Sequence, residues 1–200
     1  MTIKTIRTMD KQIRTAELRN ANAEKQNDDM TLQGYAATFD TETVLFNIGG
    51  NDYKEIIARG AFDGANFKDC ALKYNHGDVC MVLARTRGGS LSTSTDDFGL
   101  KFDAKLFNTT MAKDAHILVK EGGIDKCSFA FTIKEESYNA ETRTWTVLKI
   151  DQVFDVSIVD LPAYDNTSVE ARSLDGLERR KKQVLERINL ANELLIKTYL

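Results

Sequence analysis

The sequence has little of several residue types that define whole protein classes. Its 200 residues include only three cysteines, an odd number that cannot form a disulfide framework, and we expect Cys70, Cys80 and Cys127 to be free thiols in a reducing compartment. Only two histidines are present, and no second pair of ligands accompanies His76 and Cys80. We therefore expect neither a metal centre nor a cofactor.

Long apolar runs and an excess of one charge are also lacking. No run is long enough to span a bilayer, and residues 1–7 lack the apolar block of a secretory signal, so we expect a cytoplasmic protein. The 27 basic and 30 acidic side chains give a net charge of -3, which predicts no nucleic-acid-binding surface. The 42% of hydrophobic residues is enough for a buried core.

The chain divides into three segments by composition. Residues 1–30 are polar with only a loose helical spacing of apolar residues, which predicts a flexible or conditionally helical arm. Residues 31–172 have the patterning of a globular domain. Residues 173–200 are charged and helix-forming and carry an apolar stripe, which predicts an amphipathic helical arm; the stripe is Leu174, Leu177, Val184, Leu185, Ile188, Ala191, Leu194 and Leu195.

Short alternating segments fill the central region and predict strands. A turn at Asp96–Gly99 separates two of them into a hairpin, and a loop is expected over 136–141. The predicted strands cover 32–39, 44–48, 55–58, 71–74, 81–85, 89–95, 99–105, 127–134, 144–150 and 153–159.

One short helix is expected between the strand groups. Thr109 or Thr110 can cap it, and Gly122–Gly123 ends it. Its apolar stripe is Met111, Ala115 and Leu118. The chain is therefore expected to be mostly β with a few helices.

Two of the predicted strands carry polar side chains on the face opposite an apolar row. In 127–134, Ser128 lies opposite the row of Cys127, Phe129 and Phe131. In 153–159, Asp155 and Ser157 lie opposite the row of Phe154, Val156 and Ile158. His76 follows the strand 71–74. A serine, a histidine and a carboxylate are the components of an activated nucleophile.

These segments resemble a known family. The chain is similar to the maturation proteases of tailed-bacteriophage proheads, whose fold is similar to that of the herpesvirus assembly protease. The resemblance runs from about Gly34 to about Arg172. It rests on the segments Gly34–Phe39, Glu55–Phe62, Tyr74–His76, Val82–Thr86, Asp97–Leu100, Gly123–Phe131 and Asp155–Tyr164, in this order.

The resemblance implies a small closed or partly closed β-barrel of the herpesvirus-protease type, with the catalytic groups on its outer surface. It implies that Ser128 is the nucleophile, His76 the general base and Asp155 the third member. Two positions depart from the family pattern: Cys127 stands where Met is common, and Ala130 where Gly is common.

Other residues are candidates for these roles. Herpesvirus proteases use a second histidine as third member, so His116 remains an alternative to Asp155. Asp78 is close to His76 in sequence, and such a near neighbour rarely reaches the far ring nitrogen. Cys127 shares the apolar row and should be buried and inert.

The donors of an oxyanion hole cannot be identified from the sequence. Backbone N–H groups of a loop are the usual donors. Arg85 and Arg87 are side-chain candidates by analogy with the herpesvirus enzymes, although both also fit solvated turn positions.

We expect a serine endopeptidase of phage capsid maturation. Its expected substrates are scaffold, or the scaffold-like segment of the major capsid protein, and finally the protease itself. It would act inside the immature capsid in the cytoplasm of the bacterial host, with self-association through the C-terminal helix as an option. The main alternative is a non-catalytic assembly module that uses this helix. A general esterase is disfavoured because no Gly-x-Ser-x-Gly motif is present.

Overall fold

A computed structural model describes residues 2–6, 11–17, 30–76, 82–160 and 181–190 of the chain. The chain forms two compact units, Met1–Thr167 and Ser168–Leu200. In the second unit the described residues, 181–190, form one helix. No helix within the described ranges has the length and apolar character needed to cross a membrane. The boundaries 30/31 and 172/173 stay predictions.

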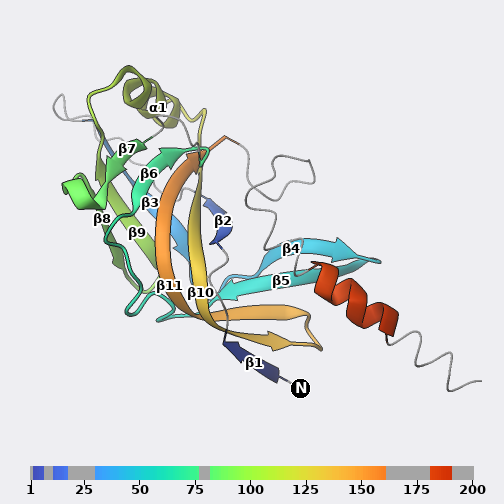
Figure 1. Cartoon of the computed structure of the whole chain (residues 1–200). Helices are drawn as coiled ribbons and strands as arrows, with labels where there is room; N and C mark the ends of the chain where they lie inside the picture. Colours follow the sequence, from blue (N-terminus) through green and yellow to red (C-terminus); the bar gives the residue numbers. More distant parts are fainter. Residues whose placement is uncertain (1, 7–10, 18–29, 77–81, 161–180, 191–200) are drawn as a thin grey trace, which may run out of the picture. The chain divides into compact units, whose positions relative to one another are not determined.

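The first unit is built mainly from strands (Figure 1). Its elements are β1 (Thr2–Ile6), β2 (Lys11–Glu17), β3 (Thr31–Thr38), β4 (Thr43–Ile48), β5 (Asn51–Ile57), β6 (Ala71–Tyr74), β7 (Val82–Arg85), a 3-10 turn (Thr86–Gly88), β8 (Leu91–Thr95), β9 (Gly99–Lys105), α1 (Thr110–Lys120), β10 (Lys126–Asn139) and β11 (Thr144–Val159).

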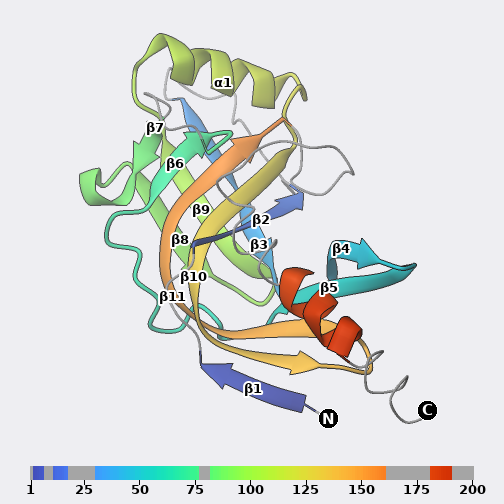
Figure 2. The same cartoon turned by 45° about the vertical axis from the view of Figure 1, so that its right-hand side comes forward.

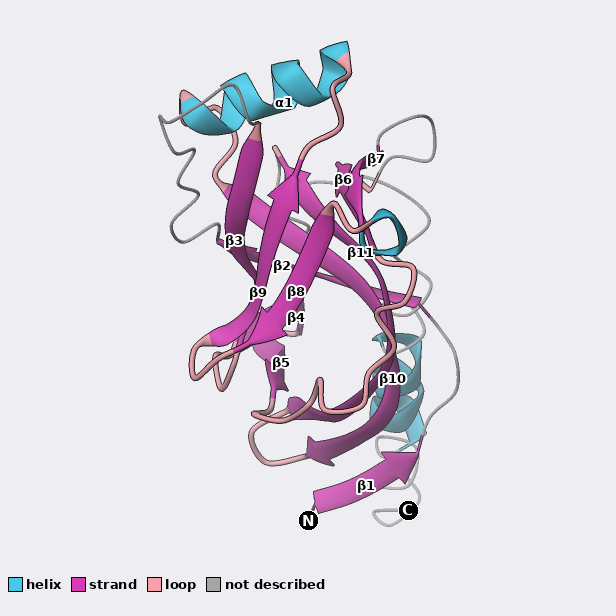
Figure 3. Cartoon of the chain, turned by 90° about the vertical axis from the view of Figure 1, so that its left-hand side faces the viewer, coloured by secondary structure: helices cyan, strands magenta, loops and turns pink. Residues whose placement is uncertain are grey.

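The strands pair into two sheets, seen facing each other in Figure 3. In the larger sheet β10 and β11 form a long antiparallel pair; β1 and β2 pair with β10, while β5 and β6 run parallel to β11. Strand β4 joins β5, and β7 joins β6. The smaller sheet has the order β3–β9–β8.

The expectation of a mostly-β protein with a few helices is therefore confirmed. The barrel is not confirmed, because the strand pairs of the described residues do not close either sheet on itself.

The hydrophobic core lies between the two sheets. Its largest fully buried side chains include Phe102 of β9, Phe129 and Phe131 of β10, and Leu72 of β6. The rings of Phe129 and Phe131 stack with centroids 4.6 Å apart, which fixes one face of β10 against the core.

Helix α1 lies across one end of the sheets (Figure 2). Thr109 caps it by accepting a hydrogen bond from the N–H of Ala112, as expected, and Gly122 follows its end with a positive φ of 75°. The expected buried stripe is displaced: Ala112, Ala115 and Val119 are buried, whereas Leu118 is exposed. The sequence spacing defined the apolar residues but not the direction in which the helix faces.

Three further expectations need correction. Within the segment 1–30, β1 and β2 are strands paired with β10 and not a flexible or helical arm, because their backbone groups complete the edge of β10. The loop expected over 136–141 is shorter, since β10 extends to Asn139 and β11 begins at Thr144. The strands expected at 144–150 and 153–159 are one continuous strand.

A buried ion pair joins β2 to β5. The guanidinium of Arg14 donates from Nε and Nη2 to the two carboxylate oxygens of Glu55, and both residues are almost fully buried. The Arg14 guanidinium also lies 5.6 Å from the ring centroid of Phe131. This pair fixes β2 to β5 within the buried part of the sheet.

Candidate active site

The sheet brings the three predicted site residues to neighbouring strands. Ser128 lies on β10, and Asp155 lies on the adjacent β11, where it pairs with Ala130. Strand β6 runs parallel to β11 on the other side, and His76 follows its last residue, Tyr74, by two positions. The serine hydroxyl, the carboxylate and the imidazole thus come from β10, β11 and the residues that follow β6.

A left-handed turn directs the imidazole of His76 back over the sheet. Asn75 and His76 have φ values of 50° and 52°, a region that few residue types other than Gly and Asn adopt readily. Asn75 is fixed to β11 because its N–H donates to the carbonyl of Ile158 (2.9 Å) and its Oδ1 accepts from the N–H of Asp160 (3.1 Å). The turn is therefore held in place by both the backbone and the side chain of Asn75.

The three side chains form a continuous chain of hydrogen bonds. His76 Nε2 lies 2.7 Å from Ser128 Oγ, and His76 Nδ1 lies 2.5 Å from Asp155 Oδ1. A carboxylate only accepts hydrogen bonds, so Nδ1 carries the proton of the neutral ring and Nε2 accepts from the hydroxyl. This arrangement can remove a proton from Ser128 and stabilise the imidazolium that results.

The site is less accessible than the sequence predicted. Ser128 and Asp155 are each only 1% exposed, whereas the side chain of His76 is 18% exposed. The expected position on the outer surface is therefore wrong for Ser128 and Asp155. Alternation shows which side chains share a face of a strand, but both faces of β10 are covered from Cys127 to Ile133.

A second hydroxyl belongs to the same network. Ser157 Oγ lies 3.0 Å from Asp155 Oδ1 and 3.2 Å from His76 Nδ1, and Ser157 is fully buried. On the other side of the carboxylate, Lys73 Nζ lies 4.0 Å from Asp155 Oδ2. The sequence places Ser157 on the same strand face as Asp155 but assigns it no role. No local pattern connects Lys73 with Asp155, because their proximity depends on the parallel pairing of β6 with β11.

The alternative residues lie elsewhere or are inert. His116 is on α1 and has no hydrogen bond to the three site residues, while the position beside His76 Nδ1 is taken by Asp155. Burial raises the pKa of the Cys127 thiol and raises that of Cys70 to about 12, so neither is a thiolate at neutral pH. Asp78 and Cys80 lie outside the described residues.

The side-chain candidates for an oxyanion hole are engaged by another residue. Arg85 donates to both carboxylate oxygens of Asp69, at 2.6 and 3.0 Å, and Arg87 lies 3.9 Å from the same carboxylate. Arg85 is on β7, which β6 and β11 separate from β10. Its guanidinium is thus bound to Asp69, on a strand that does not neighbour that of Ser128.

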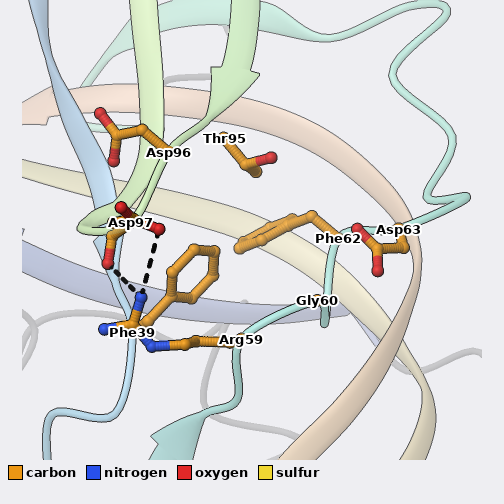
Figure 4. Close-up of a pocket in the computed structure, with 8 residues that line it drawn as sticks. All are labelled: Phe39, Arg59, Gly60, Phe62, Asp63, Thr95, Asp96 and Asp97. Atoms are coloured by element: carbon orange, nitrogen blue, oxygen red, sulfur yellow. Dashed lines mark hydrogen bonds and ion pairs between the residues drawn. The ribbon is translucent and has the colours of Figure 1, made fainter.

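A small pocket lies apart from these residues, between the loop after β5 and the β8–β9 turn (Figure 4). Arg59 lines it and donates hydrogen bonds to the carboxylate of Asp40 and the backbone carbonyl of Asp97. Among the described residues, no group of three or more His, Cys, Asp or Glu side chains is arranged to hold a metal ion.

Comparison with known proteins shows the family of the chain. The model of one family, described as caudovirus prohead serine protease, matches residues 15–182, most of the chain. No curated protein and no solved structure matches. The chain therefore belongs to the caudovirus prohead serine protease family.

Proposed function

We propose that this member of the caudovirus prohead serine protease family cleaves peptide bonds with Ser128 as nucleophile, His76 as general base and Asp155 as the carboxylate that orients the ring. The observation that supports the proposal is the unbroken hydrogen-bond chain from Ser128 Oγ through both ring nitrogens of His76 to Asp155. A purely structural strand would need no such contact between a buried hydroxyl and an imidazole.

In the first half of the reaction, Ser128 Oγ attacks the carbonyl carbon of the scissile peptide. His76 Nε2 takes the hydroxyl proton, and Asp155 stabilises the imidazolium through Nδ1–H. The tetrahedral intermediate then collapses, the C–N bond breaks, and His76 gives its proton to the leaving amine. Because His76 is the most exposed of the three, the peptide approaches from its side.

The second half regenerates the enzyme. Water attacks the ester carbonyl of the acyl-enzyme while His76 Nε2 takes one of its protons. The new tetrahedral intermediate expels Ser128 Oγ, which regains its proton from His76. The products are a carboxylic acid and an amine, and all three residues return to their starting states.

The proposed substrates follow from the family. They are the scaffold, or the scaffold-like segment of the major capsid protein, and the protease chain itself, cleaved inside the immature capsid in the cytoplasm of the bacterial host. The helix 181–190 carries exposed Leu185, Ile188 and Leu190, which supports a role for the C-terminal arm in recruiting the enzyme or in self-association. We propose 31–172 as the protease domain, to whose larger sheet β1 and β2 add strands.

Coexpression with the capsid protein of the same phage tests the function. With wild type, mass spectrometry should show shortened forms of the capsid protein and of the protease itself. With Ser128→Ala both chains should stay intact, and the variant should melt within a few degrees of wild type. Ser94→Ala, a change of an exposed serine on β8, is the matched control and should cleave normally. Cleavage by Ser128→Ala at the wild-type rate would exclude Ser128 as the nucleophile and leave the assembly-module alternative.

A further inference from the structure

We propose that Ser157 is a positioning residue that holds the carboxylate of Asp155 and the Nδ1–H tautomer of His76. The inference rests on the proposed function and adds a fourth side chain to it. The observation is that the Ser157 hydroxyl is within hydrogen-bond distance of both partners of the imidazole–carboxylate contact.

The proton count at this contact fixes the direction of each bond. The hydroxyl of Ser157 has one proton, and it donates this proton to Asp155 Oδ1 at 3.0 Å, because the carboxylate can only accept. The contact of 3.2 Å to His76 Nδ1 then leaves an Oγ lone pair facing that nitrogen. The lone pair favours a protonated Nδ1, so Nε2 is the nitrogen that faces Ser128 without a proton.

The position of Ser157 in the sheet suits this role. On β11 it pairs with Ser128 of β10 on one side and with Lys73 of β6 on the other. It lies two residues after Asp155, so both side chains are on the same face of the strand. Asp155 is thus held at Oδ1 by Ser157 and approached at Oδ2 by Lys73, 4.0 Å away.

A purely structural role of Ser157 would have different effects on stability and on reactivity. A buried hydroxyl that only satisfies a buried carboxylate would affect stability when removed, but not the reactivity of Ser128 in molecules that remain folded. A positioning role affects the rate of the chemical step and leaves the binding of a small reagent unchanged.

The first test uses diisopropyl fluorophosphate, which needs no knowledge of the natural substrate. Ser128 Oγ forms the O–P bond, the P–F bond breaks, fluoride leaves, and the hydroxyl proton passes to His76 Nε2. Mass spectrometry follows the labelled chain, and the dependence on reagent concentration separates the maximal labelling rate from the apparent affinity.

Ser157→Ala should lower the maximal labelling rate about tenfold or more, as expected for loss of a hydrogen bond to a charged group, with the affinity unchanged. Thr132→Val is the matched control: it removes a buried hydroxyl of β10 that has no hydrogen-bond partner among the residues that the structure describes, and it should label at the wild-type rate. Equal rates for Ser157→Ala and wild type would overturn the inference.

A second readout does not depend on activity. The chain has only two histidines, so nitrogen NMR of ¹⁵N-histidine-labelled protein, with His116→Gln for assignment, reports which nitrogen of the neutral His76 ring carries the proton. Wild type should have it on Nδ1, and Ser157→Ala should show a mixture of both tautomers. If diisopropyl fluorophosphate does not react with the wild-type protein, the proposed function is refuted. If the tautomer of His76 is unchanged in Ser157→Ala, the role of Ser157 is refuted.

Discussion

The two ring nitrogens of His76 have different partners, and this difference determines what each neighbouring residue contributes. Nε2 meets the group that would attack the substrate, and Nδ1 meets the group that fixes the ring. Removal of either nitrogen contact therefore affects the same proton transfer. The effects of substitutions within such a unit are not additive.

His76→Ala should reduce cleavage as severely as Ser128→Ala, by roughly 10⁴-fold or more, and the double variant should be no worse than either single one. The reason is that the hydroxyl is not activated without a base, and without the hydroxyl the base has no nucleophile to deprotonate. Rate measurements on purified protein with capsid protein as substrate check this. If the fold-loss of rate in the double variant equals the product of the two single fold-losses, Ser128 and His76 do not act together.

Asp155→Asn should cost less than His76→Ala, because it disturbs the orientation of the ring but removes neither the base nor the nucleophile. His116→Ala is the comparison, since His116 is the alternative third member. It should leave the rate close to that of wild type. If His116→Ala is more harmful than Asp155→Asn, the third member is His116.

At this scale the sequence named Ser128 and Asp155 from alternation and the family resemblance, and His76 from the resemblance; the structure brings the three side chains together, and their catalytic roles stay a proposal. It could not predict that Ser128 and Asp155 are buried. It also could not assign a role to Ser157, because its contact with His76 depends on the turn after β6 and on the parallel pairing of β6 with β11. Pairing between strands so distant in sequence leaves no local pattern.

Among the elements, the turn Asn75–His76 decides where the imidazole lies. Asn75→Ala should destabilise the protein by roughly 1–3 kcal/mol, from the left-handed φ and the lost hydrogen bond from Asp160 N–H. It should also slow labelling of Ser128 by diisopropyl fluorophosphate, because His76 is displaced. Urea denaturation and labelling kinetics measure the two effects.

Asp40→Ala is the matched control for this turn. Asp40 also has a left-handed φ, of 52°, but lies in the loop after β3. Its substitution should lower stability without slowing the labelling of Ser128. A normal labelling rate in Asn75→Ala would mean that the turn does not position the ring.

The ion pair between β2 and β5 should matter for stability. Arg14→Met leaves the Glu55 carboxylate buried without its guanidinium and should cost about 3–5 kcal/mol. The double change Arg14→Met with Glu55→Met should recover most of this loss, because no charge then remains buried at the pair. Urea denaturation of the single and double variants checks it, and equal stability of the two would contradict the account.

The sequence predicted most elements of the central region, including the β8–β9 hairpin and α1, because turn residues and caps are local signals. It failed for β1 and β2, whose composition is polar but whose backbone groups find partners on β10. It also divided β11 in two, since Asp151 and Gln152 interrupt the apolar pattern without interrupting the strand. Long-range pairing overrides local propensity in both cases.

For the whole molecule, we expect that the first unit carries the proposed protease activity and that the C-terminal arm brings the enzyme into the capsid. In the full chain, Leu185→Gln with Ile188→Gln changes two side chains that are 39% and 37% exposed on the helix 181–190. The variant should stay folded and label at Ser128 normally, but should no longer enter assembling capsids. Sedimentation of capsids followed by mass spectrometry measures entry.

Glu186→Gln is the control on the polar side of the same helix and should enter capsids normally. Truncation after Arg172 should reproduce the entry defect with activity retained. If the truncated chain instead unfolds, the arm is part of the stable fold and the recruitment role is wrong.

The parallel pairing of β6 with β11 also sets when the protein can become reactive during synthesis. Ser128 and Asp155 lie on one hairpin, but His76 precedes them by more than fifty residues in the sequence and reaches them only when β6 aligns with β11. Parallel pairs of distant strands form late, because a long loop must close first. If Ser128 acts as proposed, a nascent chain on the ribosome therefore has no reactive serine until β11 has emerged and β6 has paired with it.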